Sequence, residues 1–348
     1  MAKRPVAKRP GAKRPGAERD VAKMAASVRD GDRKALARAI TLIESTRADH
    51  RADADALLSA LLPHSGKSVR IGISGAPGVG KSTFIEALGL HLTGSGHKVA
   101  VLAVDPSSKR SGGSILGDKT RMEELARDTA AFIRPSPAGK TLGGVARRTR
   151  EAMLAAEAAG FDVIVVETVG VGQSETAVAE MTDMFVLLLS PGGGDELQGI
   201  KRGIVELADA ILVNKADGEF MKAATQAAAD YQSAVHMLRP ASAAWVVPVR
   251  TCSALTGEGI AEAWAIVERY REVTAKTNAI AERRRTQAQA WMWSEIEDSL
   301  VMALRAHPKT RQRIAALEKQ VAAGEVTPSQ ASRELIAAFR GGAGGKTP

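Results

Sequence analysis

Gly75-Ala76-Pro77-Gly78-Val79-Gly80-Lys81-Ser82 is the stretch of sequence that decides the fold. It fits the pattern Gly-x-x-x-x-Gly-Lys-Ser/Thr, whose glycines let successive backbone N–H groups face the phosphates of a nucleotide. A β-rich run precedes it at Val69–Ser74, and a helical pattern follows from Lys81 to about Leu92. Because both neighbours are those of a phosphate-binding loop (P-loop), we favour that interpretation over a glycine-rich turn that matches by chance.

The residues at the end of this loop have separate expected roles. We expect Lys81 to reach the β- and γ-phosphates of the nucleotide. The Ser82 hydroxyl, next to Thr83, is expected to bind Mg²⁺, which offsets the charge of a triphosphate.

Further β-rich runs alternate with helical patterns along the chain. Together with the first, the runs expected to be strands are Val69–Ser74, Val99–Val104, Val163–Val166, Met184–Ser190, Ile211–Asn214 and Trp245–Val249. Strands that alternate with helices form right-handed crossovers and a parallel sheet. The sequence therefore predicts an α/β fold: a P-loop NTPase with a mostly parallel central sheet flanked by helices.

A carboxylate near the metal is expected at the end of another strand. Glu167-Thr-Val-Gly170 has the spacing of the Asp-x-x-Gly turn of GTPases, with Glu in place of Asp. Gly170 could donate its N–H to the γ-phosphate and so sense hydrolysis. Glu167 alone could equally be a cap or an ion-pair partner, but the P-loop favours the metal role. Asp105 and Asp118 are further candidates for the metal shell, although Asp before Pro or Lys is often a turn residue.

Base recognition is expected from Asn214-Lys215-Ala216-Asp217, which fits Asn-Lys-x-Asp directly after a β-rich run. The Asp217 carboxylate can accept from both N–H donors on the Watson–Crick edge of guanine, whereas adenine places an acceptor at one of those positions. Lys215 can lay its methylene stem over the base, and Asn214 can brace the P-loop. Ser253-Ala254-Leu255 would add a backbone contact to the guanine oxygen. We therefore predict GTP as substrate and GDP as product.

The positive charge is concentrated at the start of the chain. The 348 residues carry a formal net charge of +9, and residues 1–19 hold seven Lys or Arg against one Glu. Lys-Arg-Pro repeats at 3–5, 8–10 and 13–15, a pattern typical of a disordered segment. It is either a solvated extension or a weak attachment to polyanions or membrane surfaces. The remaining chain is nearly balanced and only 3% of residues are aromatic, which argues against a specific nucleic-acid binder.

Other classes are excluded by what the sequence lacks. No apolar run approaches the ~18 residues of a membrane helix, and the start of the chain has no apolar signal-peptide core, so we predict a cytoplasmic protein without a membrane span. The single cysteine, Cys252, excludes an internal disulfide, and we interpret it as a small buried residue. The six histidines form no pair with zinc-ligand spacing.

These patterns divide the chain into four predicted parts. They are a disordered basic tail over 1–30, an N-terminal helical extension over 31–66, a GTPase domain over 67–275 and a helical extension over 276–348. The last part has Ala, Glu, Arg and Leu in long helical runs and no β signal. Its helices either form a dimerisation interface or pack back onto the domain, and the sequence leaves both open.

Five motifs in order carry a resemblance to a known family. They are the P-loop, Val-Asp-Pro-Ser-Ser (104–108), Glu-Thr-Val-Gly-Val-Gly-Gln-Ser (167–174), Pro-Gly-Gly-Gly-Asp-Glu-Leu-Gln-Gly-Ile-Lys (191–201) and Asn-Lys-Ala-Asp (214–217). Over about residues 30 to 340 the chain resembles the MeaB/ArgK/MMAA family of P-loop GTPases. The resemblance implies a G-protein chaperone of adenosylcobalamin-dependent methylmalonyl-CoA mutase, which gates cofactor delivery and protects or reactivates the mutase. It also implies a homodimer formed through the C-terminal helices.

The resemblance assigns further residues. It places Ser82, Asp105, Asp118 and Glu167 near Mg²⁺, and it makes 191–201 an extra switch that couples nucleotide state to the mutase. Asp195, Glu196 and Lys201 supply charges that could pair with the metal site in one nucleotide state. From the residues alone, this segment would be a flexible turn before a helix.

The turn after Glu167 also predicts slow hydrolysis. Val171 stands where Ras-like proteins carry the glutamine that orients the attacking water, so we expect a partner to accelerate the reaction. Gln173 is nearby and could substitute. Three alternatives stay open: a kinase or ATPase associated with amino-acid transport, a chaperone of a related cobalamin mutase, and an interaction protein whose nucleotide is structural.

Overall fold

The computed structural model describes residues 17–104, 122–135, 142–168, 174–191, 202–237 and 244–341. The chain divides into two compact units, residues 1–284 and residues 285–348. The first unit contains the sheet and the second contains only helices among the residues described. Each unit is considered by itself below.

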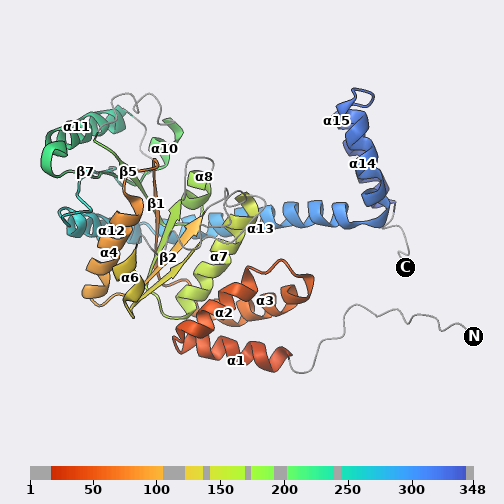
Figure 1. Ribbon diagram of the computed structural model, residues 1–348, viewed down its shortest axis with the longest axis horizontal. Coiled ribbons are helices and arrows are strands. Elements are labelled where there is room, and N and C mark those ends of the chain that lie inside the picture. The colour runs from red at the N-terminus through yellow and green to blue at the C-terminus, as the bar shows by residue number, and fades with distance from the viewer. Residues whose placement is uncertain are drawn as a thin grey trace, which may run out of the picture. The chain divides into compact units, whose positions relative to one another are not determined.

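A seven-stranded parallel sheet forms the centre of the first unit (Figure 1). The strands are β1 (Val69–Gly75), β2 (Val99–Val104), β3 (Ala131–Arg134), β4 (Val163–Thr168), β5 (Met184–Leu189), β6 (Ala210–Val213) and β7 (Val249–Thr251). Their order across the sheet is β3-β2-β4-β1-β5-β6-β7. The predicted α/β class and parallel sheet are confirmed.

Two details of the strand prediction were wrong. Strand β3 was not predicted, because Ala131-Phe-Ile-Arg134 is short and ends in a charged residue, which gives a weak β signal. The last strand was predicted at Trp245–Val249 but lies at Val249–Thr251. Trp245 instead packs edge-on against Tyr270, with ring centroids 5.0 Å apart, and donates from Nε1 to the carbonyl of Asp209. Trp245 therefore lies before β7, in a position set by its contacts with Tyr270 and Asp209.

Helices cover both faces of the sheet, so its strands are apolar on both sides, as buried parallel strands are. One face carries α4 (Lys81–Gly94), α6 (Glu123–Arg127) and α12 (Ile260–Lys276). The other carries α7 (Leu142–Ala158), α8 (Ser174–Ala179), α10 (Arg202–Leu207) and α11 (Met221–Met237). Figure 1 shows α4 and α7 on opposite sides of the strands. A short 3₁₀ turn, η2 (Gly218–Phe220), precedes α11.

Three helices at the start of the chain pack outside α7. They are α1 (Ala17–Arg29), α2 (Arg33–Ile43) and α3 (Ala48–Leu61), and a 3₁₀ turn, η1 (Leu62–His64), leads to β1. The disordered tail predicted over 1–30 is corrected for residues 17–29. Val21, Ala25 and Val28 recur at helical spacing and are buried, which gives α1 an apolar side that the neighbouring charges conceal in the sequence.

The C-terminal helices are α13 (Ala279–Ala306), α14 (Pro308–Ala322) and α15 (Pro328–Arg340). Residues 279–284 of α13 belong to the first unit, and the rest of α13 belongs to the second unit together with α14 and α15. Thr327 caps α15 by accepting from the N–H of Gln330, and Pro328 occupies the first helical position, where its missing N–H costs no hydrogen bond. Over the described stretches, no helix has the length and apolar character required to cross a bilayer.

Candidate functional site

The predicted motifs meet at one edge of the sheet. Because all strands run parallel, their carboxyl ends lie on the same side, and ligands of such folds bind there where the strand order reverses. Strand β1 lies between β4 and β5, and the chain leaves it for β2 on one side and later returns to β5 on the other. The P-loop follows β1, Glu167 lies near the end of β4, and Asn214 directly follows β6. The topology therefore gathers these residues at the reversal point.

The P-loop has a backbone that only glycine accommodates at two positions. A Cβ atom on Gly75 would lie 2.4 Å from the Leu188 carbonyl oxygen of the neighbouring strand. Gly80 has φ 93°, and a Cβ there would lie 2.6 Å from Nδ2 of Asn214. The loop thus curls tightly between β1 and α4, and its exposed crest is formed by Pro77 and Gly78. This shape leaves the N-terminus of α4 as a site for an anion.

Lys81 lies at the base of this loop. Its ammonium Nζ donates to the carbonyls of Gly75, at 2.8 Å, and Ala76, at 3.1 Å, and the residue is 9% exposed. The side chain therefore folds back over the P-loop, next to the place where a phosphate would bind. A buried ammonium in this position has the reach and the charge for a bound polyphosphate.

The structure brings Ser82 and Glu167 together. The Ser82 hydroxyl donates to Oε1 of Glu167 at 3.1 Å, and Glu167 is 4% exposed. A hydroxyl beside a buried carboxylate is a set of hard oxygen donors, and Mg²⁺ prefers such donors while keeping waters and phosphate oxygens in its shell. The residues present therefore fit a magnesium ion. No cluster of three or more Asp, Glu, His or Cys side chains with metal-ligand geometry occurs among the residues described.

Asn214 connects the P-loop to the loop after β7. Its Nδ2 donates to the Val79 carbonyl at 2.8 Å, and its Oδ1 accepts from the N–H of Ala254 at 3.0 Å. The residue is 1% exposed, so both bonds are shielded from water. The predicted bracing of the P-loop by Asn214 agrees with this geometry.

The remaining residues of the base motif form a second connection. The Ser253 hydroxyl donates to Oδ2 of Asp217, and the N–H of Ala216 donates to the Cys252 carbonyl at 3.0 Å. Lys215 is exposed and has φ 63°, which turns the chain sharply after β6. Leu255 is 81% exposed beside this connection. The two predicted base-recognition segments are therefore neighbours.

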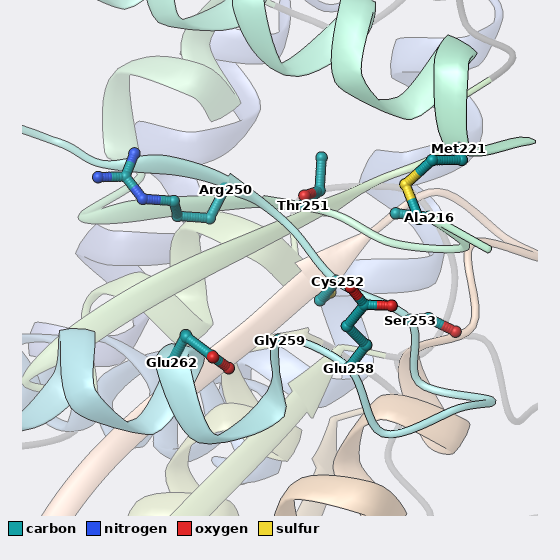
Figure 2. Close-up of a pocket in the computed structure, with 9 residues that line it drawn as sticks. All are labelled: Ala216, Met221, Arg250, Thr251, Cys252, Ser253, Glu258, Gly259 and Glu262. Atoms are coloured by element: carbon teal, nitrogen blue, oxygen red, sulfur yellow. The ribbon is translucent and has the colours of Figure 1, made fainter.

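A small pocket of about 210 Å³ adjoins these segments. Its lining residues are Ala216, Met221, Arg250, Thr251, Cys252, Ser253, Glu258, Gly259 and Glu262. Figure 2 shows Ala216 and Met221 on one side of it and Glu258 and Glu262 on the other. Burial raises the pKa of Cys252 to about 12, which keeps its thiol protonated and agrees with a packing role rather than a nucleophilic one.

Several predicted residues lie outside the part of the chain that the structure describes. They are Asp105 and Asp118 of the metal set, Gly170 and Gln173 of the hydrolytic set, and Asp195, Glu196 and Lys201 of the proposed extra switch. The described site therefore comprises the P-loop, Glu167 and the two base-recognition segments.

One pair of residues at this edge was missed by the sequence analysis. The Thr168 hydroxyl donates to the Ser74 hydroxyl at 3.0 Å, and both residues are buried. This bond joins the end of β4 to the end of β1 and so fixes the strand end that carries Glu167. The sequence offered one hint of this contact: Ser74 directly precedes the P-loop, and Thr168 directly follows Glu167.

Comparisons with known proteins identify relatives of the chain. A family model described as "Methylmalonyl Co-A mutase-associated GTPase MeaB" matches residues 36–309. A Caulobacter vibrioides protein, provisionally named a GTPase, is 56% identical over 320 residues, which cover 92% of this chain and 98% of that protein. The mouse protein named "Methylmalonic aciduria type A homolog, mitochondrial" is 47% identical over 330 residues, with 92% and 80% covered. The crystal structure of a protein named LAO/AO transport system kinase has a TM-score of 0.73 and 37% identity, covering 95% of this chain and all of that one.

Proposed function

The chain belongs to the MeaB family of methylmalonyl-CoA mutase-associated GTPases, and from this premise we propose that it is the nucleotide-driven chaperone of an adenosylcobalamin-dependent mutase. It is a GTPase with a P-loop NTPase fold, which binds guanine nucleotides and converts GTP to GDP and phosphate. The observation that carries the proposal is the contact of Ser82 with the buried Glu167 beside a P-loop that Asn214 braces. This arrangement ties a phosphate site, a carboxylate and a base motif into one unit.

We assign the residues of this site as follows. The P-loop, residues 75–82, would surround the phosphates with N–H groups, and Thr83 continues the helix behind it. Lys81 would exchange its carbonyl partners for phosphate oxygens. Mg²⁺, held by Ser82 and Glu167 with Asp105 and Asp118 nearby, would neutralise charge on the phosphates. Asp217 would select guanine, with Lys215, Ser253, Ala254 and Leu255 around the base.

Hydrolysis by this site is proposed to be slow without a partner. Val171 offers no amide to orient the attacking water, and Gln173 is the residue that could take that role. The use of the reaction is then conformational, because loss of the γ-phosphate releases the N–H of Gly170 and the charged segment of Asp195, Glu196 and Lys201. Such a switch suits gating of cofactor delivery and reactivation better than continuous turnover.

The client is proposed to be methylmalonyl-CoA mutase or a related cobalamin mutase. The family description and the name of the mouse relative support this proposal. The name of the similar transport system kinase raises the alternative of ATP-dependent phosphorylation. The Asn214–Asp217 motif argues against ATP, because a carboxylate at Asp217 faces an acceptor on adenine. We also propose that the protein acts in the cytoplasm.

A homodimer through the C-terminal helices completes the proposal. Helix α13 exposes a group of large apolar side chains: Met292, Trp293, Ile296, Leu300, Val301 and Met302. Trp293, Ile296 and Leu300 recur at the spacing of one helix face, which is typical of a face that packs against another helix. A second copy of the chain is the proposed partner for that face.

Steady-state GTP hydrolysis tests the function. The purified chain is assayed alone and with a methylmalonyl-CoA mutase, with ATP as the control nucleotide. We expect slow hydrolysis of GTP alone and stimulation of at least about tenfold by the mutase. Turnover of ATP in place of GTP would contradict the base assignment. Unchanged GTP hydrolysis over a range of mutase concentrations would remove the mutase as client.

A further inference from the structure

Two adjacent arginines near the start of α13 contact the end of α8 and the turn between α8 and β5. Arg284 forms a bidentate pair with Asp183, from Nε to Oδ1 at 2.7 Å and from Nη2 to Oδ2 at 2.6 Å. It also donates to the carbonyls of Gly66 and Ser68, just before β1. Asp183 is 2% exposed and accepts a further bond from the N–H of Arg70. All three guanidinium nitrogens of Arg284 therefore donate hydrogen bonds, and they fix the start of α13 to the amino edge of the sheet.

Arg283 makes a looser set of contacts, one of them with the end of α8. Its Nη1 donates to Oδ2 of Asp209 at 3.1 Å and to the Tyr270 hydroxyl at 3.2 Å. Its Nη2 donates to the carbonyl of Ala179, the last residue of α8, at 3.4 Å. The Asp209 carboxylate also accepts from the N–H of Phe185 in β5. Arg283 therefore touches the end of α8 and a carboxylate fixed to the sheet at the same time.

Helix α8 links this amino edge to the nucleotide edge. It begins seven residues after Glu167 in the chain and ends at Ala179, and β5 then starts at Met184. Strand β4 ends at the nucleotide edge and β5 begins at the opposite one, so α8 runs back across the sheet. Its six residues span about 9 Å. The carbonyl that Arg283 holds is thus at the far end of the helix that follows the Glu167 turn.

The packing of α8 on β1 makes it able to transmit displacement. A Cβ on Gly72 would lie 2.7 Å from Cγ1 of Val178 and 2.8 Å from Oγ1 of Thr182. The helix and the turn after it therefore lie directly on the backbone of the strand that leads into the P-loop. Closely packed elements of this kind move as rigid bodies rather than deform continuously. A shift at the start of α8 must then appear at Ala179.

We propose that Arg283 is a positioning residue that couples α8 to the start of α13, so that the nucleotide state at the P-loop changes the contact between α13 and α8. Arg284 keeps α13 attached in both states, and the weaker Arg283–Ala179 contact is the one that changes. The inference rests on the proposed guanine-nucleotide site. It extends the effect of the γ-phosphate to the helix from which the C-terminal extension continues.

Hydrogen–deuterium exchange on the full chain tests the coupling. The wild-type chain is compared with GDP and Mg²⁺ and with a non-hydrolysable GTP analogue and Mg²⁺, and exchange is followed in peptides that cover 279–290. We expect exchange in this region to differ by at least about fivefold between the two nucleotides, the lower end of common allosteric couplings. Equal exchange in both states, with both nucleotides bound, would overturn the proposal.

Variants separate coupling from folding. Arg283→Lys keeps a charge for Asp209 but lacks the second nitrogen that reaches Ala179, so we expect the exchange difference to vanish while nucleotide affinity stays within about twofold. Burial raises the pKa of Asp209 despite the opposing charge of Arg283, so removal of the guanidinium alone could unfold the chain. The double variant Arg283→Gln with Asp209→Asn leaves no unpaired charge and is expected to behave like Arg283→Lys.

Arg271→Gln, an exposed arginine of α12, is the matched control and should keep the wild-type difference. A wild-type difference retained in Arg283→Lys and in the double variant would also overturn the proposal. A chain that binds neither nucleotide would overturn the site assignment and the coupling together. A chain that keeps the exchange difference but is not stimulated by the mutase would retain the coupling and lose the proposed client.

Discussion

Lys81 is the residue whose charge the phosphate site requires most directly. It is buried, and its ammonium already lies among the P-loop carbonyls where phosphates would enter. Hydrogen bonds to charged groups contribute about 1.5–3 kcal/mol each, so Lys81→Ala should weaken GTP binding at least about 100-fold. Isothermal titration measures the affinity, and Lys67→Ala, an exposed lysine before β1, is the control. Affinity within about threefold of wild type in Lys81→Ala would refute the assignment.

Asp217 determines which base the site accepts. Its carboxylate is held by the Ser253 hydroxyl, which fixes its orientation without removing its capacity to accept further bonds. Asp217→Asn replaces one acceptor with a donor, so we expect GTP to bind at least about 100-fold more weakly and xanthosine triphosphate to bind better than GTP. Competition against a labelled nucleotide measures this exchange of preference. Glu219→Gln, two residues further along and exposed, should keep the preference for GTP.

The contacts of the site were predictable where a motif prescribes them. Ser82 with Glu167, and Asn214 with the P-loop, belong to patterns whose spacing implies that they lie close together. The hydrogen bond from Thr168 to Ser74 belongs to no sequence motif. It forms because β4 and β1 are neighbouring strands and the two residues lie side by side at their carboxyl ends. The sequence does not state which strands pair across a sheet. Contacts of that kind become visible only once the strand order is known.

The approach of α8 to β1 depends on Gly72. A side chain there would meet Val178 and Thr182 at less than 3.0 Å, so the helix would have to move. Overpacking of this kind costs about 1–3 kcal/mol, and Gly72→Ala should lower the free energy of unfolding by that amount. Chemical denaturation measures it. Gly94→Ala in α4, where a Cβ meets nothing within 4 Å, is the control and should not destabilise the protein.

The loop before β1 depends on the buried carboxylate of Glu157 in α7. Glu157 accepts from Nε and Nη2 of Arg70 at 2.8 and 2.9 Å, from the Ser68 hydroxyl and from the N–H of Gly66. Burial alone would raise the pKa of Glu157, but the hydrogen bonds and charge of Arg70 outweigh it, and the pKa lies below its usual value. The ionised form is therefore the one that stabilises the fold.

The sign of this shift predicts a pH dependence. Because the folded pKa is depressed, the stabilisation is complete above the unfolded pKa, about 4.3, and is lost as pH falls through the folded value. Glu157→Gln should cost about 3 kcal/mol at pH 7, and the difference from wild type should shrink below about pH 4. Urea denaturation of both proteins from pH 7 to pH 3 measures the difference. A difference that stays constant over this range would show that the charge of Glu157 is not the cause.

Secondary structure was predictable from the sequence where the apolar residues of a segment follow one clear pattern. The five strands from β1 to β6 apart from β3 are rich in Val, Ile and Leu and were located within two residues. Strand β3 and helix α1 were missed for different reasons. Strand β3 has one of its four positions occupied by the charged Arg134, whereas β6 of the same length is apolar throughout, and the apolar side of α1 is only Val21, Ala25 and Val28 within a charged segment. Both elements are fixed by burial against the rest of the first unit, which a local pattern does not contain.

The charge and the apolar surface of the chain are separated along its length. The excess positive charge lies in residues 1–19, whereas the described helices of the second unit begin with the exposed apolar group of α13. An exposed apolar group of this kind marks an interaction surface more often than a solvated face. Self-association through α13 is therefore a property that the whole chain should show in solution without nucleotide or client.

The double variant Trp293→Glu with Leu300→Glu tests that property, because it places two like charges on the same face of α13 where the proposed dimer buries apolar side chains. Each charge that loses water without a partner costs several kcal/mol, so the dimer should dissociate at least about 1,000-fold more readily. Sedimentation velocity on the full chain measures the species present, and Asp298→Asn, on another side of the helix, is the control. Since the P-loop belongs to the first unit, GTP affinity should stay within about twofold of wild type. A dimer that persists in the double variant would place the interface elsewhere. A wild-type chain that sediments as a monomer at micromolar concentration would contradict the dimer and make the client protein the proposed partner of the apolar face of α13.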